Sequence, residues 1–335
     1  MRVRSAAHPA RKHFVLLVSL VLILLVLLLT FFSSKTWDGA GRYSIVIQEN
    51  SQNSIVAAKI AIFSIEPVTN RAIWLSIPPE TLLVVPFGYG AYPAASVFNL
   101  GELDANDTGG ELLARSIERN FGVAIDAAII IPHEAIVSLP QSYQELINLK
   151  KNFFTVSGFF RYLLHMKSHF GNRSLNSLAP GDGWKLFWEV RSLRADQITY
   201  LDAFQLELVE PLKRPDDSIV YSLRTDRFDL LVSDLFIDHM IRSQAVSVAV
   251  VNASGQTNLA SVTQRILVNL GVNVVSKSTA KETIKDRCTI RLSTNQKEPL
   301  LVKKLTARWG CSVVFGLWDS LAAVEIILGE SFVKK

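Results

Sequence analysis

An apolar run near the N-terminus constrains this chain more than any other feature. Residues 14–32 read FVLLVSLVLILLVLLLTFF, and only Ser19 and Thr30 interrupt the run. As a helix rising about 1.5 Å per residue it spans roughly 28 Å, close to the hydrocarbon thickness of a bilayer. A buried core helix is the alternative, but such helices rarely lack a polar stripe. The run therefore predicts a transmembrane helix over 14–32.

The residues that flank this run predict its orientation. Four basic residues lie within 1–13, whereas the first acidic residue is Asp38. The positive-inside rule keeps the basic tail 1–13 in the cytoplasm and exports the chain after residue 33. The following FFSSKTWDG lacks a small-x-small cleavage site, and the run is long for a signal peptide. We expect an uncleaved signal anchor that holds a single-pass protein in the cell membrane, with its bulk extracytoplasmic.

Charge argues against nucleic acid as a partner. The net charge is +5, but four of the 35 basic residues precede the apolar run. The exported part keeps 31 basic against 30 acidic residues and is therefore nearly neutral. With 335 residues in all, this part is long enough for about two domains with their own cores.

The first exported domain is expected at 43–244, after a short spacer at 33–42. Runs rich in β-branched and aromatic residues indicate strands, and PVTNR indicates a hairpin turn. TGGELLARSIERNFG indicates a helix with Thr108 and Glu111 at capping-box spacing and Gly122 at its end. The expected strands are 43–49, 58–66, 72–77 and VAIDAAIIIP, and PFGYGAYPAAS is expected to form a loop.

The second half of this domain is mostly helical in pattern. YQELINLKKNFF, SGFFRYLLHMKSHF and WKLFWEVRSL indicate helices, PGDGW a turn and ITYLDAF a strand. Trp184 and Trp188, four residues apart, suit either a carbohydrate platform or core packing, and core packing is the commoner use. One more helix is expected at 226–242, packed beneath the next domain. Its apolar face would comprise Phe228, Leu231, Leu235 and Phe236.

The last domain, expected at 245–335, has the clearest α/β pattern. VSVAVVN, VNVVS, CTIRLS, CSVVFG and VEIILG indicate strands, and helices are expected in ASGQTNLASVTQRILVNLG and EPLLVKKLTARWG. The strand–helix–strand start implies parallel pairing. We therefore expect a membrane-anchored α/β protein with two sandwich-type domains and mixed sheets.

One strand-to-helix turn in this domain carries candidate ligand-binding residues. Asn252, Ser254 and Gly255 stand where the free N–H groups of a helix N-terminus could hold an anion. The turn contains neither G-x-G-x-x-G nor a phosphate-binding loop. The alternative is that Asn and Gly supply turn geometry and that Ser or Thr caps the helix.

The two cysteines, Cys288 and Cys311, lie in the exported part, where disulfides persist. They are close in sequence and each begins an expected strand, which favours one bridge over two buried thiols. The chain has no CxxC, HExxH or His/Cys cluster, so no metal site is expected.

The stretch WLSIPPET, residues 74–81, raises a question of its own. Glu80 and Thr81 could serve a site, or the two prolines could simply end a strand, because proline cannot donate to a sheet ladder. Taken alone, the pattern favours the strand exit.

The C-terminal residues resemble a known family. Residues 246–332, from VAVVNASGQTNLASVTQRILVNLGVNVV to AAVEIILGESF, closely resemble the LytR C-terminal domain of bacterial envelope proteins. Ser331 stands where the family's closing motif has Asp. The resemblance implies an α/β module of the cell envelope.

The first domain resembles, more loosely, the LytR-CpsA-Psr family, in which this module often follows a single membrane helix. A family strand ends in S-I-P-R-D-T, and Ser76, Ile77, Pro78 and Thr81 match it. The segments 43–130 and LFWEVRSLRADQITYLDAF also align. The resemblance implies transfer of phosphate-linked glycopolymers from a polyprenyl carrier to peptidoglycan, with arginines on the pyrophosphate and acids on Mg²⁺.

The charged residues that this chemistry needs are largely missing. Pro79 replaces the motif arginine, Glu80 replaces its acid, and VAAK (56–59) replaces a segment that supplies an arginine and a metal-binding acid. KNFFTVSG offers no substitute for the family's arginine-rich segment.

These observations lead to one favoured hypothesis and two others. We expect a non-catalytic envelope protein that binds or scaffolds in cell-wall assembly, without a cofactor. The alternative is a divergent Mg²⁺-dependent transferase in which Glu80 works with Arg42, Arg71 or Arg115, and the third is a structural module without a ligand. The expected partners are the lipid bilayer and a cell-wall glycopolymer, a polyprenyl lipid or other envelope proteins.

Overall fold

The computed structural model describes most of the chain after residue 36. The described residues are 37–51, 56–103, 108–132, 138–155, 177–293, 298–316 and 322–333, with Val18 and Ser320. The expected anchor at 14–32, apart from Val18, and the expected helix at 157–170 lie outside them and stay predictions. Within the described residues no helix is long and apolar enough to cross a membrane. The structure has two parts, here called the first unit (37–244) and the second unit (245–333).

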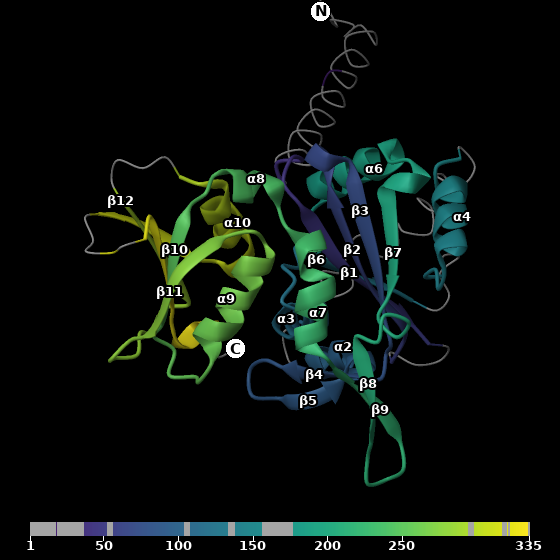
Figure 1. The fold of residues 1–335 in the computed structure, drawn as a ribbon, viewed down its shortest axis with the longest axis horizontal. Coiled ribbons are helices and arrows are strands. Elements are labelled where there is room, and N and C mark those ends of the chain that lie inside the picture. Colours follow the sequence, from purple (N-terminus) through teal and green to yellow (C-terminus); the bar gives the residue numbers. More distant parts are fainter. Residues whose placement is uncertain are drawn as a thin grey trace, which may run out of the picture.

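A mixed sheet forms the centre of the first unit (Figure 1). Of the described strands, five build it in the order β6-β1-β2-β3-β7. Pairing is antiparallel in β1–β2 and β2–β3 and parallel in β1–β6 and β3–β7. Asn70, with a φ of 50°, turns the chain between β2 and β3 in the expected hairpin. The strands are β1 (Tyr43–Asn50), β2 (Ala57–Glu66), β3 (Arg71–Ile77), β6 (Ala127–Ile131) and β7 (Ile198–Asp202).

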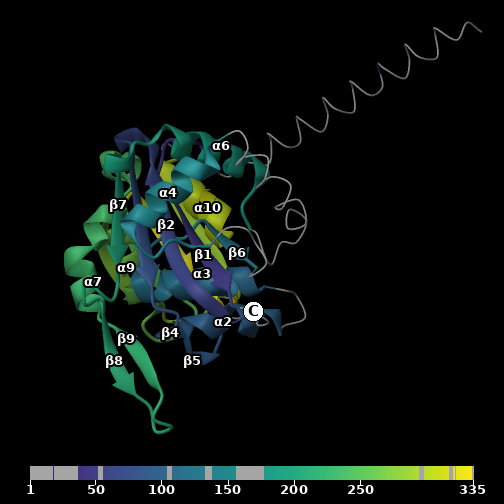
Figure 2. The same ribbon diagram turned by 90° about the vertical axis from the view of Figure 1, so that its right-hand side faces the viewer.

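Helices cover both faces of this sheet, which gives the first unit two cores (Figures 1 and 2). On one face lie α2 (Ala94–Glu102) and α3 (Gly109–Phe121), which pack over Val46, Ile62 and Leu75. Gly101 and Gly109 allow these helices to cross closely, since a Cβ on Gly101 would meet the Gly109 Cα at 2.6 Å. On the other face, α4 (Tyr143–Phe153) and α6 (Pro180–Ser192) pack over Ile45, Phe63 and Trp74.

The starts of two helices differ from the sequence expectation. Thr108 precedes α3 but makes no capping hydrogen bond with its side chain, whereas Gly122 ends the helix in the left-handed region as expected. PGDGW is not a turn, because Pro180 is the first residue of α6. Proline suits that position because its missing N–H would have no partner in the first helical turn.

A second sheet lies at one end of the first unit, and sequence reasoning missed it. Its order in the described residues is β5-β4-β9-β8. The segment expected to be a loop, PFGYGAYPAAS, contains β5 and the start of α2. The strands are β4 (Thr81–Val85), β5 (Gly90–Pro93), β8 (Val209–Lys213) and β9 (Ile219–Leu223).

The helix expected at 226–242 is broken into three pieces. These are α7 (Thr225–Leu231), a 3-10 turn (Ser233–Phe236) and α8 (His239–Ser243). The Asp238 side chain accepts hydrogen bonds from the N–H groups of Met240 and Ile241, so a new helix begins there. Phe228 and Phe236 are buried in the first unit's core, whereas Leu231 and Leu235, expected on the same face, are exposed.

The second unit is a mixed sheet with two helices on one face. Its described strands follow the order β11-β10-β14-β12-β13, and β10 pairs in parallel with both β11 and β14, as the strand–helix–strand start predicts. The helices α9 (Leu259–Asn269) and α10 (Leu300–Trp309) lie between this sheet and the first unit (Figure 1). The strands are β10 (Ser247–Asn252), β11 (Asn273–Thr279), β12 (Cys288–Ser293), β13 (Ser312–Gly316) and β14 (Val324–Leu328).

Cys288 and Cys311, the pair expected to form a bridge, are joined by a disulfide with an S–S distance of 2.00 Å. Both residues are buried in the second unit's core. The bridge ties the start of β12 to the residue before β13, so it closes the β12–α10–β13 segment covalently.

Candidate functional site

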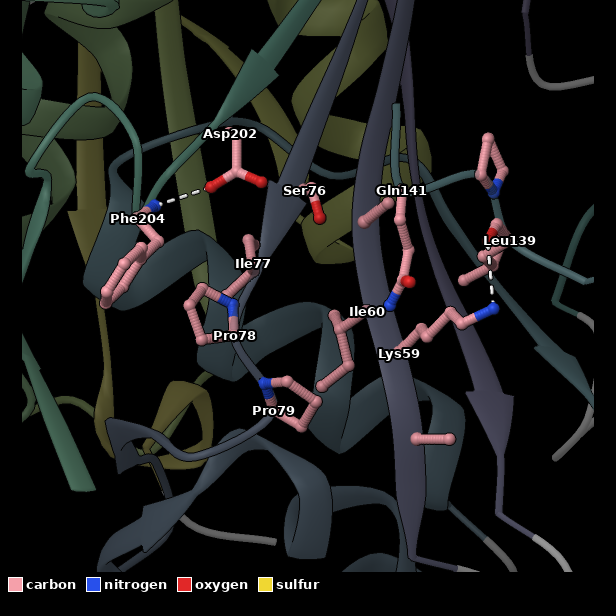
Figure 3. A pocket seen from close by; sticks show the side chains of 13 residues that line it. Lys59, Ile60, Ser76, Ile77, Pro78, Pro79, Leu139, Gln141, Asp202 and Phe204 are labelled. Atoms are coloured by element: carbon pink, nitrogen blue, oxygen red, sulfur yellow. Dashed lines mark hydrogen bonds between the residues drawn. The ribbon is translucent and has the colours of Figure 1, made fainter. Parts of the chain in front are cut away.

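The candidate site is a small cavity where the SIPP segment leaves the first sheet. Its volume is about 130 Å³. The walls come from the start of β2, the end of β3, the segment 139–141 and the loop after β7 (Figure 3). Ser76, Ile77, Pro78 and Pro79 all line it, so the sequence motif and the cavity coincide.

The two prolines end β3 and begin a tight turn. The carbonyl of Pro78 accepts a hydrogen bond from the Thr81 N–H at 3.0 Å, and that of Pro79 accepts one from the Ala95 N–H at 2.8 Å. Thr81 is buried and opens β4. The strand exit expected from WLSIPPET is what the structure shows.

Glu80 lies at the tip of this turn and is exposed. It does not line the cavity, and its carbonyl accepts a hydrogen bond from the Tyr221 N–H at 3.2 Å. The residue therefore contributes a backbone contact to the smaller sheet rather than a carboxylate to the pocket.

Two charged side chains line the cavity, and both hold its own walls together (Figure 3). Lys59 donates to the carbonyl of Leu139 at 3.1 Å and to the Ser138 hydroxyl, and it pairs with Glu49 at 3.4 Å. Asp202 accepts hydrogen bonds from the N–H groups of residues 204 and 205, at 2.8 and 3.1 Å. Among the described residues, no arginine lines this cavity.

The arginines that a rebuilt transferase site would need lie elsewhere. Arg42 is buried against Glu66, Arg71 begins β3 at the end opposite the cavity, and Arg115 faces the second unit. A magnesium site finds no support either. Within the described residues, no group of three or more His, Cys, Asp or Glu side chains could hold a metal ion. Among the described residues, the cavity wall therefore offers neither an arginine nor a group of metal ligands.

In the turn at Asn252, Ser254 and Gly255, the polar groups form hydrogen bonds with one another. The Asn252 Oδ1 atom accepts hydrogen bonds from the N–H and the hydroxyl of Ser254, and the Asn252 amide donates to the Gln256 carbonyl at 2.7 Å. Gly255 has a φ of 77°, which favours glycine. Because α9 begins only at Leu259, Ser254 does not cap it. The geometry fits the turn interpretation and does not aim these polar groups at a ligand.

Trp184 and Trp188 are not core residues. Their side chains are 42% and 48% exposed, which overturns the packing interpretation favoured by the sequence. Both lie on the outer side of α6, beside Phe187.

The end of the chain contributes to a second, smaller cavity between the units, which sequence reasoning missed. Its volume is about 50 Å³, and α3, α9 and Phe332 line it. The Phe332 ring packs edge-on against Trp309 with centroids 5.6 Å apart, and the Arg115 guanidinium lies 5.6 Å from its centre. The aromatic residue of the closing motif therefore packs the second unit against α3.

The second unit matches a known family. The model described as the LytR cell envelope-related transcriptional attenuator covers residues 245–332. The second unit is thus a LytR C-terminal domain, as the sequence resemblance implies. A comparison with curated protein sequences gives no match.

Several solved structures resemble the chain at low sequence identity. TagT of Bacillus subtilis, one structure of which holds octaprenyl pyrophosphate lipid, has 14% identity and a TM-score of 0.40, covering 71% of this chain and 94% of its own. TagV of the same organism has 9% identity and a TM-score of 0.38, covering 69% and 98%. The protein gbs0355 of Streptococcus agalactiae has 10% identity and a TM-score of 0.41, covering 70% and 89%. These values describe a weak overall likeness.

Proposed function

We propose that this chain is a non-catalytic envelope protein, anchored in the cell membrane by residues 14–32, that binds or scaffolds in cell-wall assembly on the outer side. The LytR C-terminal domain at 245–332 supports a role in the envelope. The resemblance of the first unit to the LytR-CpsA-Psr family supports a role near glycopolymer assembly.

The observation that carries the non-catalytic part is the composition of the SIPP cavity. Breaking a diphosphate bond develops negative charge, which enzymes neutralise with arginine, lysine or Mg²⁺. In the described part of this cavity the one cation is Lys59. Its ammonium group already pairs with Glu49 and donates hydrogen bonds to the Ser138 hydroxyl and the Leu139 carbonyl. Pro79 presents a ring where the family motif has an arginine.

The size of the cavity argues in the same direction. Pockets that enclose drug-sized ligands usually measure about 300–1,000 Å³, whereas this one measures about 130 Å³. A polyprenyl chain would not fit without a large rearrangement. The cavity suits a small polar group, such as part of one sugar or one amino-acid side chain of the wall.

The test uses the full chain in detergent micelles. We expect it to sediment with purified peptidoglycan sacculi, and we expect no Mg²⁺-dependent phosphate release or glycopolymer transfer from a polyprenyl diphosphate donor. Glu80→Ala should leave wall binding and function in cells unchanged, because Glu80 lies outside the cavity. The exposed carboxylate Glu210 provides a matched control as Glu210→Ala.

Two results would overturn the proposal. Mg²⁺-dependent turnover that Glu80→Ala abolishes and Glu210→Ala does not would establish the divergent transferase. Failure of the full chain to bind either sacculi or envelope proteins would leave only a structural module without a ligand.

A further inference from the structure

Two exposed tryptophans of α6 lie against half-buried phenylalanine rings of α6 and α4. The aromatic patch comprises Trp184, Phe187 and Trp188 of α6 and Phe153 and Phe154 of α4. Its rings form a continuous set, with Phe187 centroids 5.1 Å from Phe154, 5.5 Å from Trp188 and 6.1 Å from Trp184. Aromatic side chains with large exposed surface are unusual on a soluble face unless they meet a partner or a membrane.

The position of α6 in the fold places this patch at the end where the chain enters. The Trp37 N–H donates to Asp182 in the first turn of α6 at 2.9 Å, and Lys185 donates back to the Trp37 carbonyl at 2.8 Å. The other end of α6 leads into β7, which starts beside Ala72 near the start of β3. Both ends of α6 therefore lie at the same end of the sheet, opposite β4 and β5 (Figure 2).

The length of chain before Trp37 limits how far this end can lie from the bilayer. The predicted anchor ends at residue 32, and five steps of at most about 3.6 Å separate it from Trp37, or roughly 18 Å in full extension. The headgroup region beyond the hydrocarbon core accounts for about 5–8 Å of that distance. The end of the sheet that carries α6 must face the membrane surface closely.

The chemistry of the patch fits a headgroup layer. Tryptophan is enriched at membrane interfaces because its ring is apolar and its N–H is polar. Cations lie against these rings: the Arg191 guanidinium is 5.7 Å from the centre of Trp188, and the Lys150 ammonium is 5.6 Å from that of Phe154. Basic side chains near such a surface are attracted to anionic lipids.

We propose that the aromatic patch rests in the headgroup layer of the anchoring membrane and fixes the orientation of the first unit. This inference rests on the anchor in the proposed function. In this orientation the SIPP cavity points away from the bilayer, because Pro78 and Trp37 lie at opposite ends of the first sheet. Seven residues of β3, at about 3.3 Å each, separate the two ends by roughly 20 Å.

The experiment reconstitutes the full chain in vesicles of zwitterionic and anionic lipids whose acyl chains carry bromine near the headgroup. Bromine quenches nearby tryptophan emission, and the predicted anchor itself contains no tryptophan. We expect up to about a third of the emission to be quenched, because two of the six tryptophans lie in the patch. The double variant Trp184→Phe with Trp188→Phe should lose most of this quenched component, and Trp37, which contacts the start of α6, accounts for the remainder.

A matched control and a separate assay keep the outcomes distinct. Trp74→Phe removes a buried tryptophan of the sheet and should keep the quenched component. Flotation in alkaline carbonate reports on the anchor alone, and binding to sacculi reports on the wall function alone. A chain that floats but shows no quenching, or a double variant that is quenched as strongly as the unchanged chain, overturns the inference. Emission that responds to chitooligosaccharides and not to brominated lipid also overturns it, in favour of a carbohydrate platform.

Discussion

Glu66 is a carboxylate buried where the first sheet meets the chain that leads to the second unit. It pairs with Arg42 at 3.0 Å, accepts the His239 N–H at 2.7 Å and contacts the His239 ring at 2.8 Å. The Thr69 hydroxyl donates to it at 2.8 Å. Burial by itself raises the pKa of Glu66, but the His239 and Arg42 interactions outweigh burial and lower it below 4.5. The contribution of such a carboxylate to the free energy of unfolding depends on pH.

The sign of that dependence follows from the direction of the pKa shift. Because the folded pKa lies below the unfolded value, Glu66 stabilises the native state above about pH 4.5 and loses this contribution as pH falls through the folded pKa. The pKa of the neighbouring Asp238 is shifted in the opposite direction. Burial raises this pKa, and the nearby positive charge of Lys304 offsets the rise only in part. Urea unfolding from pH 7 to pH 3 should show that the free energy of unfolding falls less steeply with decreasing pH in Glu66→Gln than in the unchanged chain.

The same variant should lose stability at neutral pH. Leaving Arg42 buried without its partner costs about 3–5 kcal/mol. Glu210→Gln, which changes an exposed carboxylate of β8, should alter the free energy of unfolding by less than about 0.5 kcal/mol. Parallel pH profiles for Glu66→Gln and the unchanged chain would contradict this account.

At the scale of elements, the sequence predicts a strand or helix correctly where an apolar run is bounded by turn residues. Strands such as 43–49 and 72–77 and the whole second unit follow that rule. The smaller sheet does not, because its strands are short and half exposed and because PFGYGAYP is rich in glycine and proline. The 226–242 segment keeps helical spacing, yet burial of Phe236 in the first unit and capping by Asp238 break it. The SIPP motif located the cavity, but the pairing of Lys59 and Asp202 with its walls depends on tertiary contacts that no local pattern reveals.

The disulfide restrains the second unit covalently. It closes a segment with a sequence separation of 23. In the chain-entropy model a loop of this length contributes about 3 kcal/mol, because the bridge restricts the unfolded chain. Reduction, or the Cys288→Ala and Cys311→Ala double variant, should lower the free energy of urea unfolding by about that amount. Reductant should not change the double variant further, and an unchanged unfolding midpoint on reduction would refute the estimate.

For the whole molecule, the contact between the two units decides whether they act as one body. It is charged as well as apolar. Arg265 of α9 pairs with Asp229 at 2.7 Å and donates to the carbonyl of Asn120 at 2.7 Å. Lys304 of α10 reaches Asp126 at 3.4 Å and the carbonyl of Arg42. The same Arg42 pairs with Glu66, so the buried cluster of the first unit is linked to the second. A rigid pair would hold the LytR C-terminal domain at a fixed angle to the aromatic patch.

A short ion pair also links the units, between Arg308 of α10 and Glu118 of α3. The pair is 2.6 Å apart and both side chains are buried. Arg308→Met leaves Glu118 without its main partner, so we expect a loss of about 3 kcal/mol and separate unfolding of the units. Urea unfolding followed by tryptophan emission and by protease susceptibility should then give two midpoints instead of one.

Arg291→Met, which removes a half-exposed pair with Glu325 within the second unit, is the matched control and should cost less than about 1 kcal/mol. Adding Glu118→Gln to Arg308→Met should recover only part of the loss, because the Glu118 carboxylate is then neutral but Arg115, 3.7 Å away, also loses a charged partner. If Arg308→Met unfolds at the same midpoint as Arg291→Met, in one transition by both probes, the buried pair does not hold the units together.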